Sequence, residues 1–399
     1  MPSWKLCVPD DSTAHNVIIY TTSRSLLLPS FMSGARSGGA LEAVRVRELE
    51  RGCVVAGAAP VSCLDYHREG EYLVATSDDD SVRLINALEG KERKKVFCKK
   101  YGVELARFTH HPQGIICSSR QSTNQAAAPT GSSAHDIRYL SLYDNQYLRF
   151  FSGHEARVTG LAMSYTDDRF LSASMDGTVR IWTLQQPKCL GLGSIGGDGG
   201  SNHNAQPVLA EFDPSGLVFA ACAQVHDRHL LKLYDARKFS EGAFESFGIS
   251  EAELRETLQQ QQPTIDPEVA RKLVQAPWTD MHFSADGKNL LVSTRAGMTL
   301  VIDTYDLQIT RFLTGYRNTG GLDITACYTP DAGHILTGSE DGNVCVFDAG
   351  EERTMDGIVH RLEGHPRPVQ QVRCNPVYEQ VASGCSHVVL WISATGKGK

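Results

Sequence analysis

A short motif recurs along this chain at a spacing close to the size of a small four-stranded sheet. Its fullest copy closes residues 153–183, where Asp176-Gly-Thr-Val-Arg-Ile-Trp182 follows a run of apolar and small residues. Each copy reads as short strands joined by turns. The long gap between positions 234 and 302 indicates inserted sequence. The seven equivalent positions are 85, 143, 182, 234, 302, 347 and 391.

The basic period of about 40 to 45 residues is typical of a four-stranded WD40 propeller blade. Seven repeats predict an all-β fold, a seven-bladed WD40 β-propeller over residues 44–393. The last repeat ends after its third strand near Trp391, and an alternating segment at 44–49 precedes the first complete blade. We therefore expect this N-terminal strand to complete the last blade and close the ring.

The remaining segments are an N-terminal extension, a tail and three insertions. The extension (1–43) is expected to be partly ordered at most, and the tail (394–399) to fray. Strand order places the insertions 120–135, 195–205 and 249–276 on one face of the ring. Insertions on one face of a repeat protein mark a binding surface as often as they mark tolerated loops.

The third insertion carries helix signals. Ser250 with Glu253 forms a capping-box pattern, and Asp266 before Pro267 marks a second helix start. We expect a helical hairpin that either docks on the ring or receives a partner helix.

One repeat contains four residues that suggest two different roles. His154, Ser172, Asp176 and Trp182 are expected to form a buried hydrogen-bonded chain across the strands, because buried polar groups need partners. A Ser-His-Asp set also suggests a hydrolase, but Ser172 lies in a regular strand without a Gly-x-Ser-x-Gly elbow. Later repeats keep only parts of the set, which favours a structural role. We predict no catalytic residue, cofactor or metal ligand.

Composition restricts the function classes further. The 39 basic and 46 acidic residues give a net charge of −7, which argues against a general or sequence-specific nucleic-acid binder. No apolar run is long enough for a membrane span. Eleven scattered cysteines indicate reduced, buried thiols in the cytosol or nucleus. His226 and His229 are interpreted as a solvent-exposed pair without a third zinc ligand.

A basic run stands out in this acidic chain. Six cations fall within ten residues on the expected outer strand of the first blade and the turn after it. Such lysines protect an exposed sheet edge from aggregation, or they dock a phosphorylated or acidic partner. Two further arginines, Arg157 and Arg367, are expected at the channel opening. The six cations are Lys91, Arg93, Lys94, Lys95, Lys99 and Lys100.

Several blocks are more specific than the general repeat. KKYGVELARFTH (99–110), DIRYLSLYDNQYLRFFSGH (136–154), FDPSGLVFAA (212–221) and LKLYDARKF (231–239) closely resemble the WD-repeat eighty-two family. That family supplies the small propeller subunit shared by Set1/COMPASS histone methyltransferases and by complexes of type-1 protein phosphatase with its nuclear targeting subunit. The resemblance covers roughly residues 44–393.

The resemblance implies a nuclear, non-catalytic scaffold that is not an obligate homo-oligomer. Its implied partners are the phosphatase-targeting subunit, a Set1-type methyltransferase and the phosphorylated tail of RNA polymerase II. The extension and insertions set this chain apart, so we rank phosphatase and transcription-termination complexes ahead of the methyltransferase. The alternatives are a scaffold in RNA 3′-end processing or ubiquitin-ligase recruitment and, from another class, a propeller hydrolase.

Overall fold

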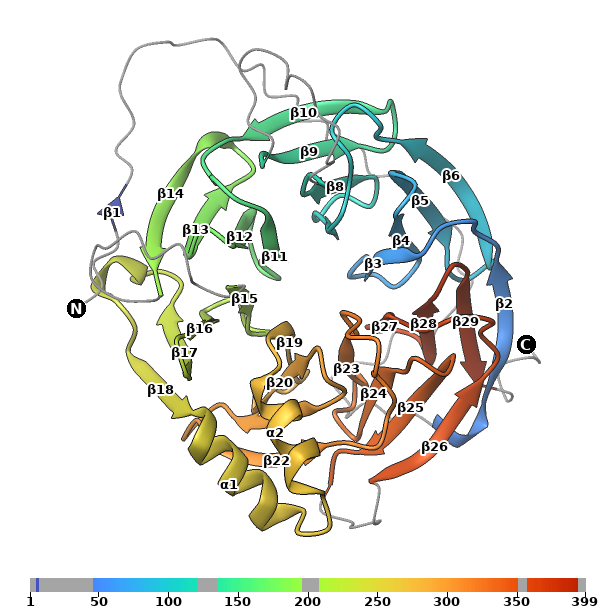
Figure 1. Ribbon diagram of the computed structural model, residues 1–399. Coiled ribbons are helices and arrows are strands. Elements are labelled where there is room, and N and C mark those ends of the chain that lie inside the picture. Colours follow the sequence, from blue (N-terminus) through green and yellow to red (C-terminus); the bar gives the residue numbers. More distant parts are fainter. Residues whose placement is uncertain (1–4, 7–45, 121–134, 196–207, 351–356, 394–399) are drawn as a thin grey trace.

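Seven antiparallel sheets, six with four strands and one with a short fifth strand, are arranged in a ring around a central channel (Figure 1). The computed structural model describes residues 5–6, 46–120, 135–195, 208–350 and 357–393. This confirms the predicted seven-bladed WD40 β-propeller. In each blade the first strand along the chain lies innermost and the fourth outermost, except that the fourth strand of blade seven comes from the N-terminal part of the chain.

In the described parts of the first three blades, the strands follow one another without a helix. Their strands are β3 (Val61–Tyr66), β4 (Tyr72–Ser77), β5 (Ser81–Asn86) and β6 (Lys91–Phe97); β7 (Ala106–Phe108), β8 (Gly114–Cys117), β9 (Ile137–Ser141) and β10 (Gln146–Phe151); and β11 (Val158–Met163), β12 (Arg169–Ser174), β13 (Thr178–Thr183) and β14 (Gln186–Ser194). A two-residue strand, β1 (Lys5–Leu6), pairs with the outer edge of β14.

The other blades include two α-helices between blades four and five. Their elements are β15 (Leu209–Phe212), β16 (Val218–Val225), β17 (Arg228–Asp235) and β18 (Glu245–Ser250); α1 (Glu251–Gln261) and α2 (Pro267–Gln275); β19 (Trp278–Phe283), β20 (Asn289–Thr294), β21 (Thr299–Asp303) and β22 (Ile309–Leu313); β23 (Ala326–Tyr328), β24 (His334–Gly338), β25 (Asn343–Asp348) and β26 (Ile358–Glu363); and β27 (Gln371–Cys374), β28 (Gln380–Gly384), β29 (Val388–Ser393) and β2 (Leu49–Val55). Two 3₁₀ turns lie at Val46–Glu48 and Phe239–Glu241.

Blade three shows how the repeat sequence specifies its sheet. Phe170 and Trp182 face each other across β12 and β13 and stack with 12° between their planes. The turn between these strands uses Asp176, whose carboxylate accepts the backbone N–H of Thr178 at 2.9 Å. Gly177 follows at φ 78°, a conformation that glycine adopts without strain. Apolar residues therefore set the packing, and the Asp-Gly pair sets the turn.

The ring closes as predicted, but the closing strand begins later. β2 pairs with β29 from Leu49 opposite Ser393 to Val55 opposite Val388. Within the expected segment 44–49, residues 46–48 form a 3₁₀ turn and only Leu49 belongs to the strand. The register shifts between Arg51 and Cys53, and this bulge interrupts the alternation by which a strand is recognised in sequence.

One of the seven repeat positions was placed incorrectly. The residue paired with Ile115, as Trp182 is paired with Phe170, is Leu140 and not Tyr143. Tyr143 lies in a turn and is 77% exposed. The error has a local cause, because the tripeptide Leu-Tyr-Asp occurs at 142–144 in this turn and again at 233–235, where Tyr234 is buried in a strand.

The predicted helical hairpin is present and docks on the ring. The Ser250 N–H donates to the Glu253 carboxylate at 2.8 Å, and the Ser250 hydroxyl accepts from the Glu253 N–H at 3.3 Å. Asp266 caps α2 by accepting the Glu268 N–H at 2.8 Å. The helices bury one cluster of side chains against blades four and five. These side chains are Leu254, Leu258, Ala270, Leu273 and Val274.

Glutamines at the end of the hairpin cover a sheet edge. The side-chain amide of Gln261 donates to the carbonyl of Thr310 at 3.3 Å, and that of Gln262 donates to the carbonyl of Phe312 at 2.9 Å. Both carbonyls belong to β22, the outermost strand of blade five. The hairpin therefore satisfies backbone groups that would otherwise be open to another strand.

The other predicted extra segments lie largely outside the described residues. This applies to most of 1–43, to 121–134 and 196–205 within two insertions, and to the tail 394–399. Within the described ranges, neither helix has the length and apolar character needed to cross a membrane. Every cysteine in those ranges is a free thiol, and most are buried.

Candidate functional site

The four residues singled out in blade three meet in one hydrogen-bonded chain. His154 Nδ1 lies 2.8 Å from a carboxylate oxygen of Asp176, and its Nε2 lies 2.6 Å from the Ser172 hydroxyl. The Trp182 indole N–H donates to the same hydroxyl at 2.8 Å. Burial acts to raise the pKa of Asp176, but its hydrogen bonds with His154 and Thr178 outweigh burial, so the pKa of Asp176 is lowered. Burial lowers the pKa of His154.

Burial decides between the two roles considered for this chain. Ser172 is completely buried between β11 and β13, so its hydroxyl cannot meet a substrate. Blade seven repeats part of the arrangement: His365 Nε2 lies 2.6 Å from the Ser383 hydroxyl, which accepts the Trp391 indole N–H at 2.7 Å. The geometry joins the second and third strands of a blade to the connection that precedes its first strand.

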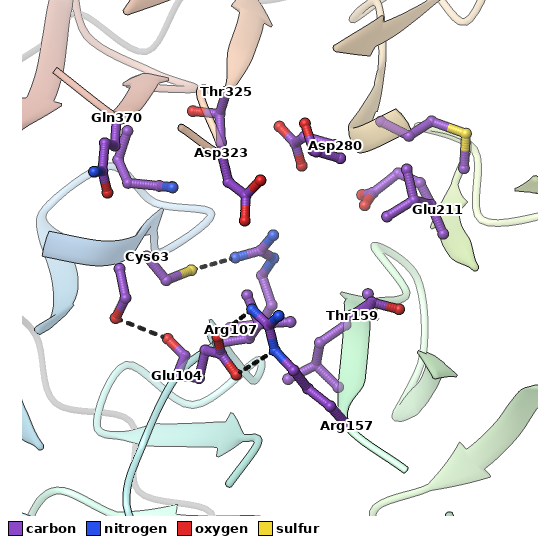
Figure 2. Close-up of a pocket in the computed structure, with 18 of the residues that line it drawn as sticks. Cys63, Glu104, Arg107, Arg157, Thr159, Glu211, Asp280, Asp323, Thr325 and Gln370 are labelled. Carbon is purple, nitrogen blue, oxygen red and sulfur yellow. Dashed lines mark hydrogen bonds and ion pairs between the residues drawn. The ribbon is translucent and has the colours of Figure 1, made fainter. Parts of the chain in front are cut away.

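The mouth of the central channel is a charged pocket of about 230 Å³ (Figure 2). It lies on the face formed by the connections between blades and by the turns between second and third strands. Antiparallel strand order puts both kinds of connection on one side of the ring, and the helical hairpin is one of them. Its charged lining residues are Asp78, Glu104, Arg107, Arg120, Arg157, Glu211, Asp280, Asp323 and Arg373.

Most of these charges are paired. Arg157 binds Glu104, with Nε donating to a carboxylate oxygen at 3.0 Å. Asp323 lies 2.6 Å from Arg295, and Asp280 lies 3.8 Å from Arg373. The first two pairs crosslink neighbouring blades around the opening, and the third joins the inner strands of blades five and seven.

Glu211 differs from the other carboxylates of the channel. Its carboxylate makes no hydrogen bond or ion pair with another residue in the described ranges. Burial raises its pKa to about 8, although Arg107 and Arg373 act in the opposite direction. Glu211 also lines a second cavity, of about 360 Å³, on the other side of the channel.

Sequence reasoning did not locate a set of seven equivalent residues, one on the inner strand of each blade, which we call the inner ring. Each of these residues stands one position before the last paired residue of the inner strand, and an aromatic residue follows it in five blades. Six of the seven line the channel cavities, and Ala162 is buried in an apolar cluster. That aromatic marker is the signal that would have located the ring. The equivalent residues are Asp65, Arg107, Ala162, Glu211, His282, Cys327 and Arg373.

A propeller hydrolase, the alternative from another class, would need an acidic or histidine cluster at the channel mouth. Acidic residues do gather there. Among the described residues, however, no group of three histidine, cysteine or carboxylate side chains is placed to hold a metal ion. The arginines bound to these carboxylates neutralise most of the acidic charge of the channel mouth.

The basic run lies on β6 and in the turn after it, at the outer rim of blade one and away from the channel (Figure 1). Its members have different surroundings. Lys94 donates to the carbonyls of Leu142 at 2.6 Å and Tyr143 at 2.8 Å, so it ties blade one to blade two. Arg93 pairs with Glu89, four residues earlier.

The remaining cations gather around two aromatic rings. The ammonium groups of Lys95 and Lys99 lie 4.9 and 5.5 Å from the ring centre of Phe97, which is 53% exposed. Lys100 lies 5.0 Å from the ring centre of Tyr101. We call Lys95, Phe97 and Lys99 the β6 basic patch. Lys91 is exposed at the start of the same strand.

The structure does not bring the two predicted channel arginines together. Arg157 lines the channel mouth, where its guanidinium is bound to Glu104. Arg367 is exposed between β26 and β27 and is not part of the pocket wall.

The interpretation of His226 and His229 as an exposed pair is wrong for His229. His226 is exposed in the turn before β17, but His229 is completely buried in that strand. Its ring stacks on Trp278, with ring centres 4.5 Å apart and 7° between the planes. Neither ring nitrogen makes a hydrogen bond of good geometry within the described chain, although the backbone of Val274 stands nearby. The docked hairpin explains this burial.

Comparison with known proteins places the chain among related propellers. The WD domain, G-beta repeat family model matches residues 51–86, 145–183 and 308–348. The chain is 34% identical to WD repeat-containing protein 82 of Drosophila melanogaster, over 85% of this chain and 92% of the relative. It is 30% identical to the Set1 complex component swd2 of Schizosaccharomyces pombe, over 83% and 92%. The COMPASS component SWD2 of Saccharomyces cerevisiae is 28% identical, over 84% and 91%.

Proposed function

Because this chain belongs to the family of WD repeat-containing protein 82, we propose that it is a non-catalytic scaffold in nuclear chromatin and transcription complexes. The similarity to named Set1 and COMPASS components over more than four-fifths of the chain carries the proposal. These relatives favour a Set1-type methyltransferase complex. The sequence alone had ranked the phosphatase complex first.

The architecture supports binding rather than chemistry. Salt bridges link the blades around the channel mouth, and the hydroxyl of Ser172 is inaccessible. A rigid surface loses little entropy when a flexible segment binds it, so the cost falls mainly on ordering that segment. The face that carries the inter-blade connections, including the helical hairpin, is the proposed contact face for linear segments of a methyltransferase or a phosphatase-targeting subunit.

Copurification tests membership in these complexes. We expect the tagged full-length protein, isolated from nuclear extract, to recover a Set1-type methyltransferase, a phosphatase-targeting subunit, or both. RNA polymerase II is expected as a more weakly held component. The proposal fails if no methyltransferase, phosphatase, termination-factor or polymerase component is recovered. Recovery of ubiquitin-ligase or RNA-processing subunits instead would support the alternative scaffold roles.

The β6 basic patch is the proposed contact for a phosphorylated segment. Two ammonium groups flank an exposed aromatic ring, so one site offers both charge for a phosphate and an apolar surface for the peptide around it. Asp79 lies 3.4 Å from Lys95 and competes with a bound phosphate for its ammonium group. This contact would link the scaffold to the phosphorylated tail of RNA polymerase II.

Charge reversal tests the β6 basic patch. We expect the double variant Lys95→Glu/Lys99→Glu to bind a phosphorylated polymerase-tail peptide at least about tenfold more weakly than the unchanged protein, because two phosphate contacts are lost. The control Lys188→Glu/Lys272→Glu changes net charge equally at exposed positions on β14 and α2. Titration by fluorescence anisotropy measures both. Equal affinities in the two variants would eliminate the patch as the docking site.

A further inference from the structure

Two cysteines from neighbouring blades meet beside the channel. Cys327 lies on β23, the inner strand of blade six, and Cys374 lies on β27, the inner strand of blade seven. Their sulfur atoms are 3.6 Å apart. Both side chains join the apolar cluster between blades six and seven. They are 47 residues apart in sequence, so the fold brings them together.

The pair is accessible from the channel. Both residues line the cavity of about 360 Å³ on the side opposite the charged mouth. Arg107, Glu211 and Arg373 line the same cavity, which makes it polar enough to admit water and small polar molecules. Cys63 lies on the opposite side, in the charged mouth, where Arg107 donates to its sulfur at 2.8 Å. Cys98 and Cys385 are buried next to strand ends, and the other buried cysteines of the described chain lie within strands. Cys53, which is partly exposed, donates to a backbone carbonyl.

The two thiols are chemically different. The hydrogen bond from Cys374, together with the positive charge of Arg373, lowers the pKa of Cys327 against the effect of burial and of Asp280. The same contact, burial and the charge of Asp331 raise the pKa of Cys374. A lower pKa at Cys327 than at Cys374 fits an attacking and a resolving cysteine, because the thiol that ionises more readily is the nucleophile.

We propose that Cys327 and Cys374 are a hydroperoxide-reactive pair that closes into a disulfide between blades six and seven. The Cys327 thiolate attacks the hydroperoxide, an S–O bond forms as the O–O bond breaks, and the departing oxygen takes a proton to leave as an alcohol or water. Cys327 is thereby oxidised by two electrons to a sulfenic acid. The Cys374 sulfur then attacks that sulfur and loses its proton, and water leaves. In total, two thiols and one hydroperoxide give a disulfide, an alcohol or water, and one further water.

Only a small movement is needed to close the bond. A disulfide has a sulfur–sulfur distance near 2.05 Å, so the two sulfurs must approach by about 1.5 Å. The bond would join two inner strands that otherwise contact each other only through side chains and a few backbone hydrogen bonds. The oxidised ring is therefore held covalently at one of its blade boundaries, and reduction by thiols restores the original form.

Thiol mapping of the full-length protein tests the pair directly. After brief exposure to hydrogen peroxide, free thiols are alkylated and the protein is digested. Cleavage after Glu340 and Glu379 separates Cys327 from Cys345 and Cys374 from Cys385. We expect one linked peptide joining Cys327 to Cys374, lost on reduction, while the other buried cysteines remain alkylated only after unfolding. Recovery of both thiols in reduced form, or a preference for any other pairing, overturns the proposal.

Single variants test the assigned roles. In Cys374→Ser we expect a sulfenic acid to accumulate at Cys327, where dimedone traps it. In Cys327→Ser we expect trapping at Cys374 to be at least about tenfold slower. Cys53→Ser, which removes a partly exposed thiol elsewhere, should leave the Cys327–Cys374 bond unchanged. Equal trapping at the two positions contradicts the assignment, and the mapping of the unchanged protein stands whether or not a variant folds.

Discussion

Two buried histidines show how differently this fold treats the same side chain. His154 is hydrogen bonded through both ring nitrogens, to Asp176 and to Ser172. His229 lies against an indole ring without a well-formed hydrogen bond. Burial lowers the pKa of both, and that of His229 falls to about 4. Both rings are therefore neutral in the folded protein near pH 7.

The lowered pKa of His229 predicts acid sensitivity. As the pH falls below about 6.5, the unfolded chain binds a proton at this residue before the folded chain does, so stability is lost from there down to about pH 4. At pH 5 the loss is about 2 kcal/mol, from 1.5 pH units at about 1.4 kcal/mol each. His229→Phe keeps the stacked ring and should remove this share of the pH dependence in urea unfolding measured at pH 7 and pH 5.

The exposed neighbour His226 provides the control for that measurement. His226→Gln should leave the difference between pH 7 and pH 5 as it is in the unchanged protein, because this side chain lies in solvent. If His229→Phe loses as much stability on acidification as the unchanged protein does, His229 is not the group responsible.

At the residue scale, sequence reasoning succeeded where a motif repeats. The four blade-three residues stand at fixed places in a recurring pattern, so their meeting could be anticipated from the letters alone. The inner ring could not be read in this way, because its equivalent positions hold acids, bases, an alanine and a thiol. What those positions share is strand register, and register becomes visible only when strands are paired.

At the scale of elements, the docked hairpin gives the next prediction. Leu258 is completely buried against blades four and five, whereas Val269 on the same hairpin is 49% exposed. Leu258→Ala should lower the free energy of unfolding by about 2–5 kcal/mol, the range found when a buried leucine is truncated. Val269→Ala should change it by about 0.5 kcal/mol or less. Chemical denaturation measures both, and similar losses would show that the hairpin is not anchored through this cluster.

The hairpin and the closing strand also show what decides whether an element is predictable. Both helices were located from their caps, Ser250 and Asp266, since a cap is a local signal. The closing strand was expected, but its start was misplaced because a bulge at Gly52 breaks the apolar alternation. In blade two a tripeptide identical to one in blade four pointed to Tyr143 instead of Leu140. Local signals fix caps and turns, but pairing partners fix the position of a strand.

For the whole molecule, closure by β2 predicts a sharp difference between two truncations. Removing residues 1–45 leaves β2 and its ladder to β29 in place. Removing 1–55 takes away the strand and three core side chains, Val46, Leu49 and Val55, and leaves the edge of blade seven open. The longer truncation should lower the thermal midpoint by about 10 °C or more, since several kcal/mol of burial and pairing are lost.

Calorimetry with size-exclusion chromatography distinguishes the two truncated proteins. The shorter truncation should keep one cooperative transition and elute as a monomer. The longer one should associate, because β29 becomes an unprotected edge. Equal midpoints for the two proteins would mean that the ring is held closed by contacts other than the β2–β29 ladder.

The pairing of β2 with β29 also determines when the ring can close during synthesis of the protein. Val55 pairs with Val388, so about 330 residues must be added after β2 before it meets its partner. At elongation rates of 5–20 residues per second, that interval is roughly 15 to 70 seconds. During that interval β2 has no partner strand, and the residues at its two ends, which are buried in the folded ring, are exposed. A chaperone that binds this segment until translation ends would therefore protect the whole ring. A permuted gene that begins at blade one and encodes β2 directly after β29 would not need such a chaperone.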